Sequence, residues 1–262
     1  MSSRAARDVR EIDLNVDCGE SYGPWRMGHD SALMPWVSSV NLACGGHAGD
    51  PLTMLASVRL AHQHQLAIGA HPSYPDLLGF GRRSLPLSDQ ELYAWMLAQI
   101  GSLRAIVQAE GGQLRHVKPH GALYHDLDLK PALASAFVAA VAGMDRSLRV
   151  VGAPNGGLAH ASHQSGLAFA AEGFVERGYG PDGRLLPRGQ AGAQLHEVAA
   201  VLAQASALAL QRGVRCGDGT WIALDVQTLC LHGDHPDAAS LAQAVRTHLQ
   251  AQGVCIRALD SR

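Results

Sequence analysis

Acidic, basic and imidazole side chains follow several β-like segments of this chain, each near the point where the segment ends. Asp17 and, just beyond it, Glu20 come after the first segment, while His71, Lys118 and His120 follow later ones. One aspartate with two histidines can hold a divalent ion or a reactive water molecule. A lysine beside them could stabilise an oxyanion as its charge develops. Asp17, His71, Lys118 and His120 are therefore the candidate catalytic residues, and Asp17, His71 and His120 the candidate metal ligands.

Each of these side chains also has an ordinary structural interpretation. Asp17 could cap the loop that follows its strand, and a lone histidine is usually a satisfied polar residue. Lys118 could be a partly exposed lysine with a buried stem. The spacing of the aspartate and the histidines is long-range and unlike the compact HExxH motif, so a metal-free site stays open. The convergence of these residues at strand ends is what favours catalysis.

Other polar residues at strand ends are candidates for binding a small anionic substrate. Arg177, Arg188 and Gln190 belong to residues 176–192, a glycine-rich polar stretch that is typical of a lid or binding loop. Arginine suits a carboxylate because its guanidinium donates paired hydrogen bonds. The remaining candidates follow other strands: Asn15, Glu20, Asn41, His47, Glu172 and His232, with Asp234 close by.

The elements that position these residues alternate between β-like and helical segments, which predicts a mostly parallel sheet. The expected strands span residues 11–16, 39–43, 66–70, 114–118, 148–152 and 167–172, with at least one more in 222–231 and a possible last one at 254–258. A length of 262 residues suits one α/β domain, a (β/α) barrel of about seven or eight units. Barrel enzymes build their sites at the carboxyl ends of the strands. An open doubly wound sheet is the alternative.

Helix ends are visible in the sequence. Asp50 before Pro51 is typical of an N-cap followed by proline at the first helical position. Ser88 with Glu91 forms a capping box, and apolar residues after it recur at helical spacing as far as Gly111. These signals predict two well-delimited helices.

A further long helix is predicted over residues 193–212, with Gly213 as the glycine that ends it. No linker, repeat or composition break interrupts the chain. We therefore expect a single catalytic domain over residues 1–262, with residues 1–10 as a disordered tail.

Composition narrows the function further. A net charge of -2 with no basic run argues against nucleic acid, and no apolar stretch reaches the length of a membrane span. Five cysteines without a CxxC pair fit reduced thiols, and the N-terminus lacks a signal-peptide core, so we expect a cytoplasmic protein. Residues 178–183 match GxGxxG, but no helix follows them, and neither lysine follows a glycine as a Walker A loop requires. Any use of ATP cannot come from a P-loop in this chain.

Seven segments of the sequence resemble the LamB/YcsF family, from about residue 11 to the C-terminus and in the family's order. They are residues 13–20 (DLNVDCGE), 41–50 (NLACGGHAGD), 68–76 (IGAHPSYPD), 116–121 (HVKPHG), 176–179 (ERGY), 186–188 (LPR) and 230–234 (CLHGD). The resemblance implies a (β/α) barrel variant similar to that of carbohydrate deacetylases. In those relatives an Asp/His/His set holds a metal, which corresponds by position to Asp17, His71 and His120.

The resemblance also implies an activity. The family implies the A component of a bacterial ATP-dependent 5-oxoprolinase, which converts 5-oxo-L-proline, ATP and water to L-glutamate, ADP and phosphate together with partner subunits B and C. Two alternatives stay open: a free-standing metal-dependent amidase or deacetylase, and a non-catalytic subunit that binds oxoproline. Cys18 and Gly46 stand where leucine and phenylalanine are expected, and the missing aromatic at Gly46 predicts a wider pocket beside His47.

Overall fold

A closed barrel of parallel strands forms the centre of the protein. The computed structural model describes residues 10–233 and 237–259. The barrel strands in this part of the chain are β1 (Glu11–Cys18), β2 (Ser39–Ala43), β3 (Ala67–His71), β4 (Leu114–Val117), β5 (Arg149–Gly152), β6 (Phe169–Phe174) and β9 (Thr228–Leu231). They pair in this order, and β9 closes the barrel by pairing with both β6 and β1. The predicted (β/α) barrel is confirmed, and the open sheet is excluded.

The first strand shows how polar side chains come to fill the barrel. Side chains alternate between the two faces of a strand. Asp13, Asn15 and Asp17 are all buried and contact residues of other strands inside the barrel. Leu14 and Val16, on the opposite face, join the main apolar cluster. The apolar core therefore lies between strands and helices, and the interior of the barrel is left for polar chemistry.

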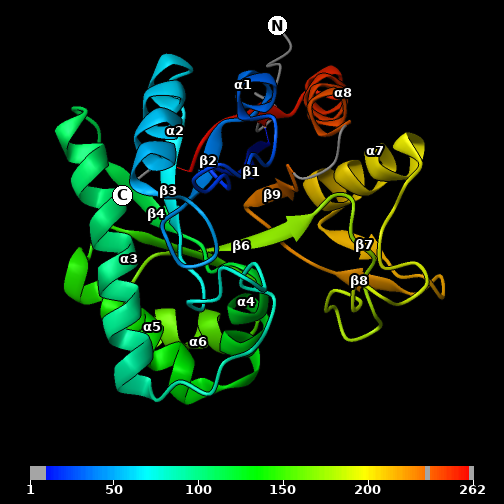
Figure 1. Cartoon of the computed structure of the whole chain (residues 1–262). Helices are drawn as coiled ribbons and strands as arrows, with labels where there is room; N and C mark the ends of the chain where they lie inside the picture. Colours follow the sequence, from blue (N-terminus) through cyan, green and yellow to red (C-terminus); the bar gives the residue numbers. More distant parts are fainter. Residues whose placement is uncertain (1–9, 234–236, 260–262) are drawn as a thin grey trace, which may run out of the picture.

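Helices surround the barrel on its outside (Figure 1). They are α1 (Asp30–Leu33), α2 (Pro51–Gln63), α3 (Asp89–Ala109), α4 (Gly121–Leu129), α5 (Pro131–Met144), α6 (Gly157–Ser165), α7 (Val198–Ser206) and α8 (Ala238–Ala251). A 3₁₀ turn, η1 (Met34–Trp36), follows α1. Neighbouring helices pack on one another: α3 on α5, α5 on α6, and α7 on α8.

The chain leaves the barrel between its last two strands. After α7, β7 (Gly213–Arg215) and β8 (Trp221–Ala223) form an antiparallel pair beside the barrel (Figure 1). The segment predicted to hold at least one strand, residues 222–231, therefore contains the end of β8 and all of β9. At the end of the chain β10 (Cys255–Ile256) pairs with the start of β1.

The two predicted helix starts are confirmed. The Asp50 carboxylate accepts hydrogen bonds from the backbone N–H groups of Leu52 and Thr53 at 2.9 and 3.2 Å. Ser88 and Glu91 form the reciprocal capping box at the start of α3. Both caps satisfy backbone donors that have no partner within the helix.

The helix predicted over residues 193–212 is wrong at both ends. Its first residues belong to the loop after β6, since the N–H of Leu195 donates to the Glu176 carbonyl at 2.8 Å, and α7 begins only at Val198. The helix ends in a π-helical turn, η2 (Ala207–Gln211), and Arg212 rather than Gly213 takes the left-handed conformation, with φ of 52°.

Gly213 serves another purpose, which the sequence pattern did not reveal. It is the first residue of β7, and the Trp221 ring of β8 lies directly against it. A Cβ atom at this position would collide with that ring, so glycine is required by packing and not by a helix end.

Residues 1–9 of the predicted tail lie outside the described residues, whereas Arg10 is held in place. Its guanidinium donates to the carbonyl oxygens of Ala209 and Val226 at 3.1 and 3.0 Å. No single helix in residues 10–233 and 237–259 is long and apolar enough to cross a membrane. Within those two ranges, α4 and α5 taken together, bent by 116° at their junction, are the one pair of helices that satisfies the criterion of length and composition.

Candidate active site

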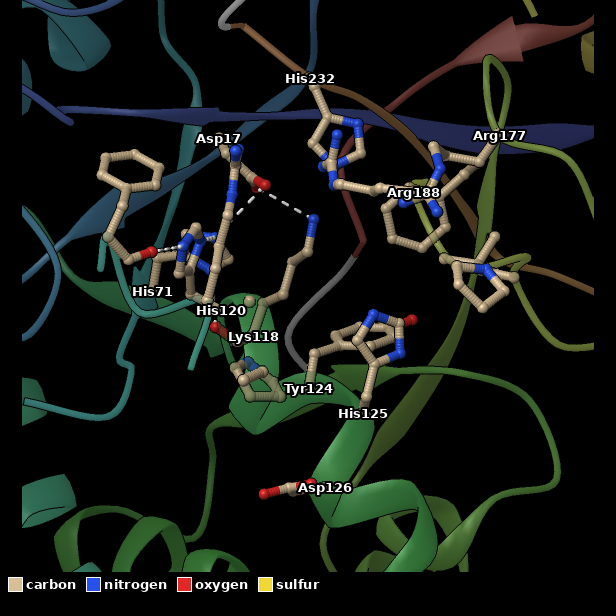
Figure 2. Close-up of a pocket in the computed structure, with 18 of the residues that line it drawn as sticks. Asp17, His71, Lys118, His120, Tyr124, His125, Asp126, Arg177, Arg188 and His232 are labelled. Atoms are coloured by element: carbon tan, nitrogen blue, oxygen red, sulfur yellow. Dashed lines mark hydrogen bonds and ion pairs between the residues drawn. The ribbon is translucent and has the colours of Figure 1, made fainter. Parts of the chain in front are cut away.

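A pocket of about 400 Å³ lies at the carboxyl ends of the barrel strands (Figure 2). The four candidate catalytic residues, Asp17, His71, Lys118 and His120, all line it. They come from β1, β3 and the segment that joins β4 to α4. Because parallel strands all end at the same rim, residues that are distant in the sequence meet here.

Lys118 and Asp17 form a buried ion pair at the base of the pocket. Lys118 Nζ lies 2.9 Å from Asp17 Oδ1 and 2.9 Å from Glu172 Oε1, and the lysine side chain is 2% exposed. Burial alone would raise the pKa of Asp17, but the interactions with His71 and Lys118 outweigh it and hold that pKa well below its ordinary value. Burial would lower the pKa of Lys118, but the carboxylates and Cys230 hold it well above its ordinary value. Both partners are therefore charged.

Three predicted substrate-binding residues lie one layer deeper in the barrel. Glu172, Asn15 and Asn41 are buried and do not line the pocket. The Asn15 amide donates to Glu172 Oε1 at 3.1 Å, and the Asn41 amide donates to Asp17 Oδ1 at 2.8 Å. Glu172 lies deep because β6 continues for two residues beyond it, to Phe174. These residues hold the Lys118–Asp17 pair in place and do not face a substrate.

Histidines and one carboxylate gather beside the ion pair. His120 Nδ1 lies 3.0 Å from His71 Nε2, and His47 stacks on His120 with ring centroids 3.6 Å apart. His47 Nε2 lies 3.2 Å from Glu20 Oε1. Burial, together with the neighbouring histidines, lowers the pKa of both His47 and His120 well below the ordinary value. Glu20 lines the pocket, whereas His47 is buried behind it.

This group could hold a metal ion. Glu20, His47, His71 and His120 each offer one ligand atom, and those four atoms lie within 4.8 Å of one another. The set shares His71 and His120 with the ligands expected from the sequence, but Glu20 and His47 stand where Asp17 was expected. Asp17 is adjacent, with Oδ2 3.3 Å from His71 Nε2, and its other oxygen binds Lys118.

The opposite side of the pocket comes from the loop after β6 and from the end of β9 (Figure 2). Arg177 is buried and donates to the carbonyl oxygens of Ala193 and Leu186 at 3.0 and 2.6 Å, so it holds the loop together. Arg188 is exposed, and its Nη2 lies 3.0 Å from His232 Nε2.

Three other candidates from this region have different outcomes. Gln190 is exposed and does not line the pocket. Asp234 lies outside the described residues. His232 lines the pocket, and its Nδ1 contacts Glu176, a buried carboxylate that the sequence pattern did not single out.

Two aromatic residues of the pocket were also missed. Phe174 lines the pocket between Lys118 and His232: Lys118 Nζ lies 5.3 Å from its ring centroid, and the His232 ring stacks on it at 5.5 Å. It follows Glu172 by two residues, and this spacing places both on one strand face. Tyr124 lies one helical turn after His120 and presents a buried hydroxyl without a hydrogen-bond partner. A sequence prediction that continued β6 to Phe174 would have included the first residue, and one that began a helix at Gly121 would have included Tyr124.

The expected widening of the pocket at Gly46 is wrong. A Cβ atom there would collide with Gln99 of α3 and with Ser73, so a side chain at this position would point toward α3 and away from the pocket. Gln99 is buried and bonds both the N–H and the carbonyl of Ser73, at 3.0 and 2.8 Å. Gln99 therefore supports the loop after β3. It occupies the space that a side chain at position 46 would enter.

Comparison with known proteins agrees with this fold and shows the family. The family model described as the LamB/YcsF family matches residues 12–262. The chain belongs to the LamB/YcsF family. A curated relative from Methylococcus capsulatus, named as the A subunit of 5-oxoprolinase, is 50% identical over 251 residues, which cover 96% of each chain.

Two solved structures are similar in fold to this chain, to different degrees. The lactam utilization protein from Thermus thermophilus is 43% identical, with a TM-score of 0.91 over 95% of this chain and 100% of that one. The catalytic domain of a peptidoglycan N-acetylglucosamine deacetylase from Eubacterium rectale gives a TM-score of 0.50 at 10% identity, covering 100% of this chain and 93% of that one. The deacetylase likeness concerns the barrel alone.

Proposed function

We propose that this LamB/YcsF protein is the A component of an ATP-dependent 5-oxoprolinase and opens the lactam ring of 5-oxo-L-proline to give L-glutamate. The observation that carries the proposal is the buried, charged Lys118–Asp17 pair at the base of a pocket of about 400 Å³. The relative named as the A subunit of 5-oxoprolinase, 50% identical over 96% of the chain, supplies the substrate class. Pockets of this size suit small molecules.

Lactam opening requires an activated water molecule, a stabilised oxyanion and a protonated leaving nitrogen. Lys118 is the group for the oxyanion, because it is a buried ammonium fixed by two carboxylates at 2.9 Å. Asp17 is a poor final proton acceptor, since its pKa is held well below the ordinary value. His71 is better placed to take the proton of the water, with Asp17 Oδ2 3.3 Å from its Nε2 to stabilise the charged ring. His120, which contacts His71, is the other candidate base.

The substrate carboxylate is assigned to the loop side of the pocket. Arg188 is exposed at the rim, and its contact with the His232 ring leaves other guanidinium donors for a carboxylate. Arg177 already donates to two carbonyl oxygens, so its role is to shape the loop. This division leaves the lactam carbonyl for the side of the pocket that carries Lys118.

ATP is consumed by the assembled enzyme in this proposal, and partner subunits B and C would supply its binding site. A five-membered lactam is unstrained and recloses readily, which gives coupling to ATP a physical purpose. Transfer of the γ-phosphoryl group to the lactam oxygen would release ADP. Attack of one water molecule at the carbon, with cleavage of the C–N bond and protonation of the leaving nitrogen, would open the ring to an acyl phosphate, and a second water molecule would release phosphate and give glutamate. The use of ATP and five free cysteines favour the cytoplasm as the site of the reaction.

The test measures 5-oxoproline-dependent release of glutamate and ADP by this chain alone, by subunits B and C alone, and by the mixture. We expect both products in equal amounts and only from the mixture. His120→Ala in the mixture should abolish glutamate formation while its melting temperature stays near that of the wild type. Glutamate formation by subunits B and C without this chain would contradict the proposal.

A second function is favoured by one observation, the group formed by Glu20, His47, His71 and His120. A free-standing, metal-dependent amidase would use such a group without ATP or partner subunits. Incubation of this chain alone with N-acetylated sugars and with 5-oxoproline, with and without added Zn²⁺, tests it. Release of acetate or glutamate without ATP would favour this function over the first.

A further inference from the structure

His71 and His120 each have one ring nitrogen fixed by a backbone carbonyl. His71 Nδ1 lies 2.8 Å from the Lys118 carbonyl oxygen, and His120 Nε2 lies 3.0 Å from the Phe80 carbonyl oxygen. A carbonyl oxygen only accepts, so each of these nitrogens donates and carries the ring proton. The other two nitrogens, Nε2 of His71 and Nδ1 of His120, are therefore bare in the neutral rings.

Those two bare nitrogens face each other across 3.0 Å, and neither has a proton to donate. Glu20 Oε1 lies 3.7 Å from His120 Nδ1 and 3.2 Å from His47 Nε2. Four atoms with lone pairs are thus gathered beside the pocket, within 4.8 Å of one another. The contact between the bare nitrogens of His71 and His120 is repulsive and is relieved by a positive charge between them, either a metal ion or a shared proton.

The backbone near this group is shaped to hold His120. Phe80 and Gly81 both adopt left-handed conformations, with φ of 53° and 64°. This conformation is uncommon for an aromatic residue and persists where the surrounding structure enforces it, often at ligand sites. A Cβ atom at Gly81 would come within 2.9 Å of the His120 ring and 3.0 Å of His47 Cβ. This tight loop places the Phe80 carbonyl beside His120 Nε2. The hydrogen bond there leaves Nδ1 as the nitrogen of His120 without a proton.

We propose that Glu20, His47, His71 and His120 bind one divalent ion of the zinc class. Ligand atoms held about 2.0–2.1 Å from a tetrahedral zinc ion lie roughly 3.3 Å apart. Three of the six separations in this group, 3.0, 3.2 and 3.7 Å, lie near that spacing, and all six are within 4.8 Å. Three imidazoles favour Zn²⁺ or Co²⁺ over Mg²⁺ and Ca²⁺, which prefer oxygen ligands. A carbonyl on the second nitrogen of a metal-binding histidine is the usual support for such a ligand.

With an ion bound, His71 and His120 give their lone pairs to the ion and neither acts as the base, so the role of His71 as base belongs to the metal-free chain. Asp17 stays beside the ion as the partner of Lys118. An ion of this class supplies Lewis acidity toward a carbonyl or phosphoryl oxygen. Its use in lactam hydrolysis rests on the proposed function, whereas the binding site rests on the geometry alone.

The experiment uses the full-length chain, without its partner subunits and without an affinity tag. Chelator-treated protein is titrated with ZnCl₂ by calorimetry and with CoCl₂ by visible absorption, and the protein as purified is analysed for metal content. We expect one ion per chain and the intense visible bands of cobalt with tetrahedral nitrogen and oxygen ligands. The absence of stoichiometric Zn²⁺ and Co²⁺ binding would overturn the proposal and leave a shared proton between His71 and His120.

Two variants locate the ion. Glu20→Gln keeps the size of the side chain and removes its charge, and it should weaken Zn²⁺ binding at least tenfold and alter the cobalt spectrum. His125→Gln is the matched control, because His125 lines the same pocket away from the four ligands (Figure 2) and should bind Zn²⁺ as the wild type does. Equal Zn²⁺ affinity of the wild type and Glu20→Gln would show that Glu20 is not a ligand and would overturn the proposed set of four ligands. The wild-type cobalt spectrum decides the case if Glu20→Gln fails to fold.

This proposal and the oxoprolinase proposal can fail separately. Metal-free protein that forms glutamate at the full rate with its partner subunits would reject a role for the ion and keep the function. One ion per chain, with no oxoproline turnover in the complete mixture, would keep the metal site and reject the oxoprolinase function.

Discussion

The two sides of the pocket are held by different kinds of structure (Figure 2). On the barrel side, Asp17, His71, Lys118 and His120 are at most 7% exposed and are fixed by several hydrogen bonds and ion pairs. On the loop side, Arg188 is exposed, and its guanidinium contacts the ring of His232. Rigid elements suit groups whose geometry decides the chemistry, whereas loops suit recognition. The contrast supports the proposal that catalysis belongs to the barrel side and substrate binding to the loop side.

The largest effect should come from Lys118→Met on the barrel side. The substitution leaves the carboxylates of Asp17 and Glu172 buried without their cation, and breaking a buried pair in this way costs about 3–5 kcal/mol of the free energy of unfolding. Urea denaturation of the wild type and the variant measures the difference. A loss of less than about 1 kcal/mol in the free energy of unfolding would mean that Lys118 and its two carboxylates interact more weakly than their distances indicate.

A smaller effect, of another kind, is expected from Arg188→Gln on the loop side. We expect the KM for 5-oxoproline in the reconstituted enzyme to rise about tenfold, equivalent to about 1.4 kcal/mol of binding, with kcat and melting temperature unchanged. Arg184→Gln is the control, since Arg184 belongs to the same loop but does not line the pocket. A loss of kcat with unchanged KM would contradict the division between the two sides.

The smallest effect should come from Asp50→Ala, which removes a support of the barrel side without touching the pocket. The Asp50 carboxylate caps α2 and also accepts from the N–H of Gly23, in the loop that follows β1. Loss of such a cap costs about 1 kcal/mol at neutral pH. Thermal unfolding at several pH values would measure the cost.

The same variant has an expected pH dependence. Hydrogen bonds from the backbone of Gly23 and from Thr53 lower the pKa of Asp50 to about 2 from the ordinary 3.8. A carboxylate with a lowered pKa stabilises the fold fully above its unfolded-state pKa and loses that contribution as the pH falls through its folded-state pKa. The stability difference between the wild type and Asp50→Ala should therefore be constant above pH 4 and shrink as the pH falls toward 2. A difference independent of pH would show that the charge of Asp50 contributes nothing.

Much of the barrel side could be predicted from the sequence. Strand ends are marked by a change from apolar to polar residues, and parallel strands end at one rim, so Asp17, His71, Lys118 and His120 could be grouped before their contacts were known. Helix caps at Asp50 and Ser88 are local signals and were equally readable. These predictions needed no knowledge of side-chain contacts across the barrel.

The remaining details depend on contacts that no local pattern encodes. The depth of Glu172 follows from the two further residues of β6, and strand ends are the least certain part of a sequence prediction. Glu20 and His47 lie beside His71 and His120, whereas one oxygen of Asp17 binds Lys118, a residue 101 positions away in the sequence. The start of α7 moved because residues 193–195 pair with the loop after β6. In the last two cases a contact between residues distant in the sequence overrode the local pattern.

The most direct test of a catalytic barrel side is the rate of glutamate formation by Asp17→Asn in the reconstituted enzyme. Lys118 keeps Glu172 as a partner in this variant, so the fold should persist with a melting temperature close to that of the wild type. We predict that glutamate formation falls at least a hundredfold while 5-oxoproline still binds, as measured by calorimetry. Turnover at the wild-type rate would contradict the account and would move the chemistry away from the Lys118–Asp17 pair.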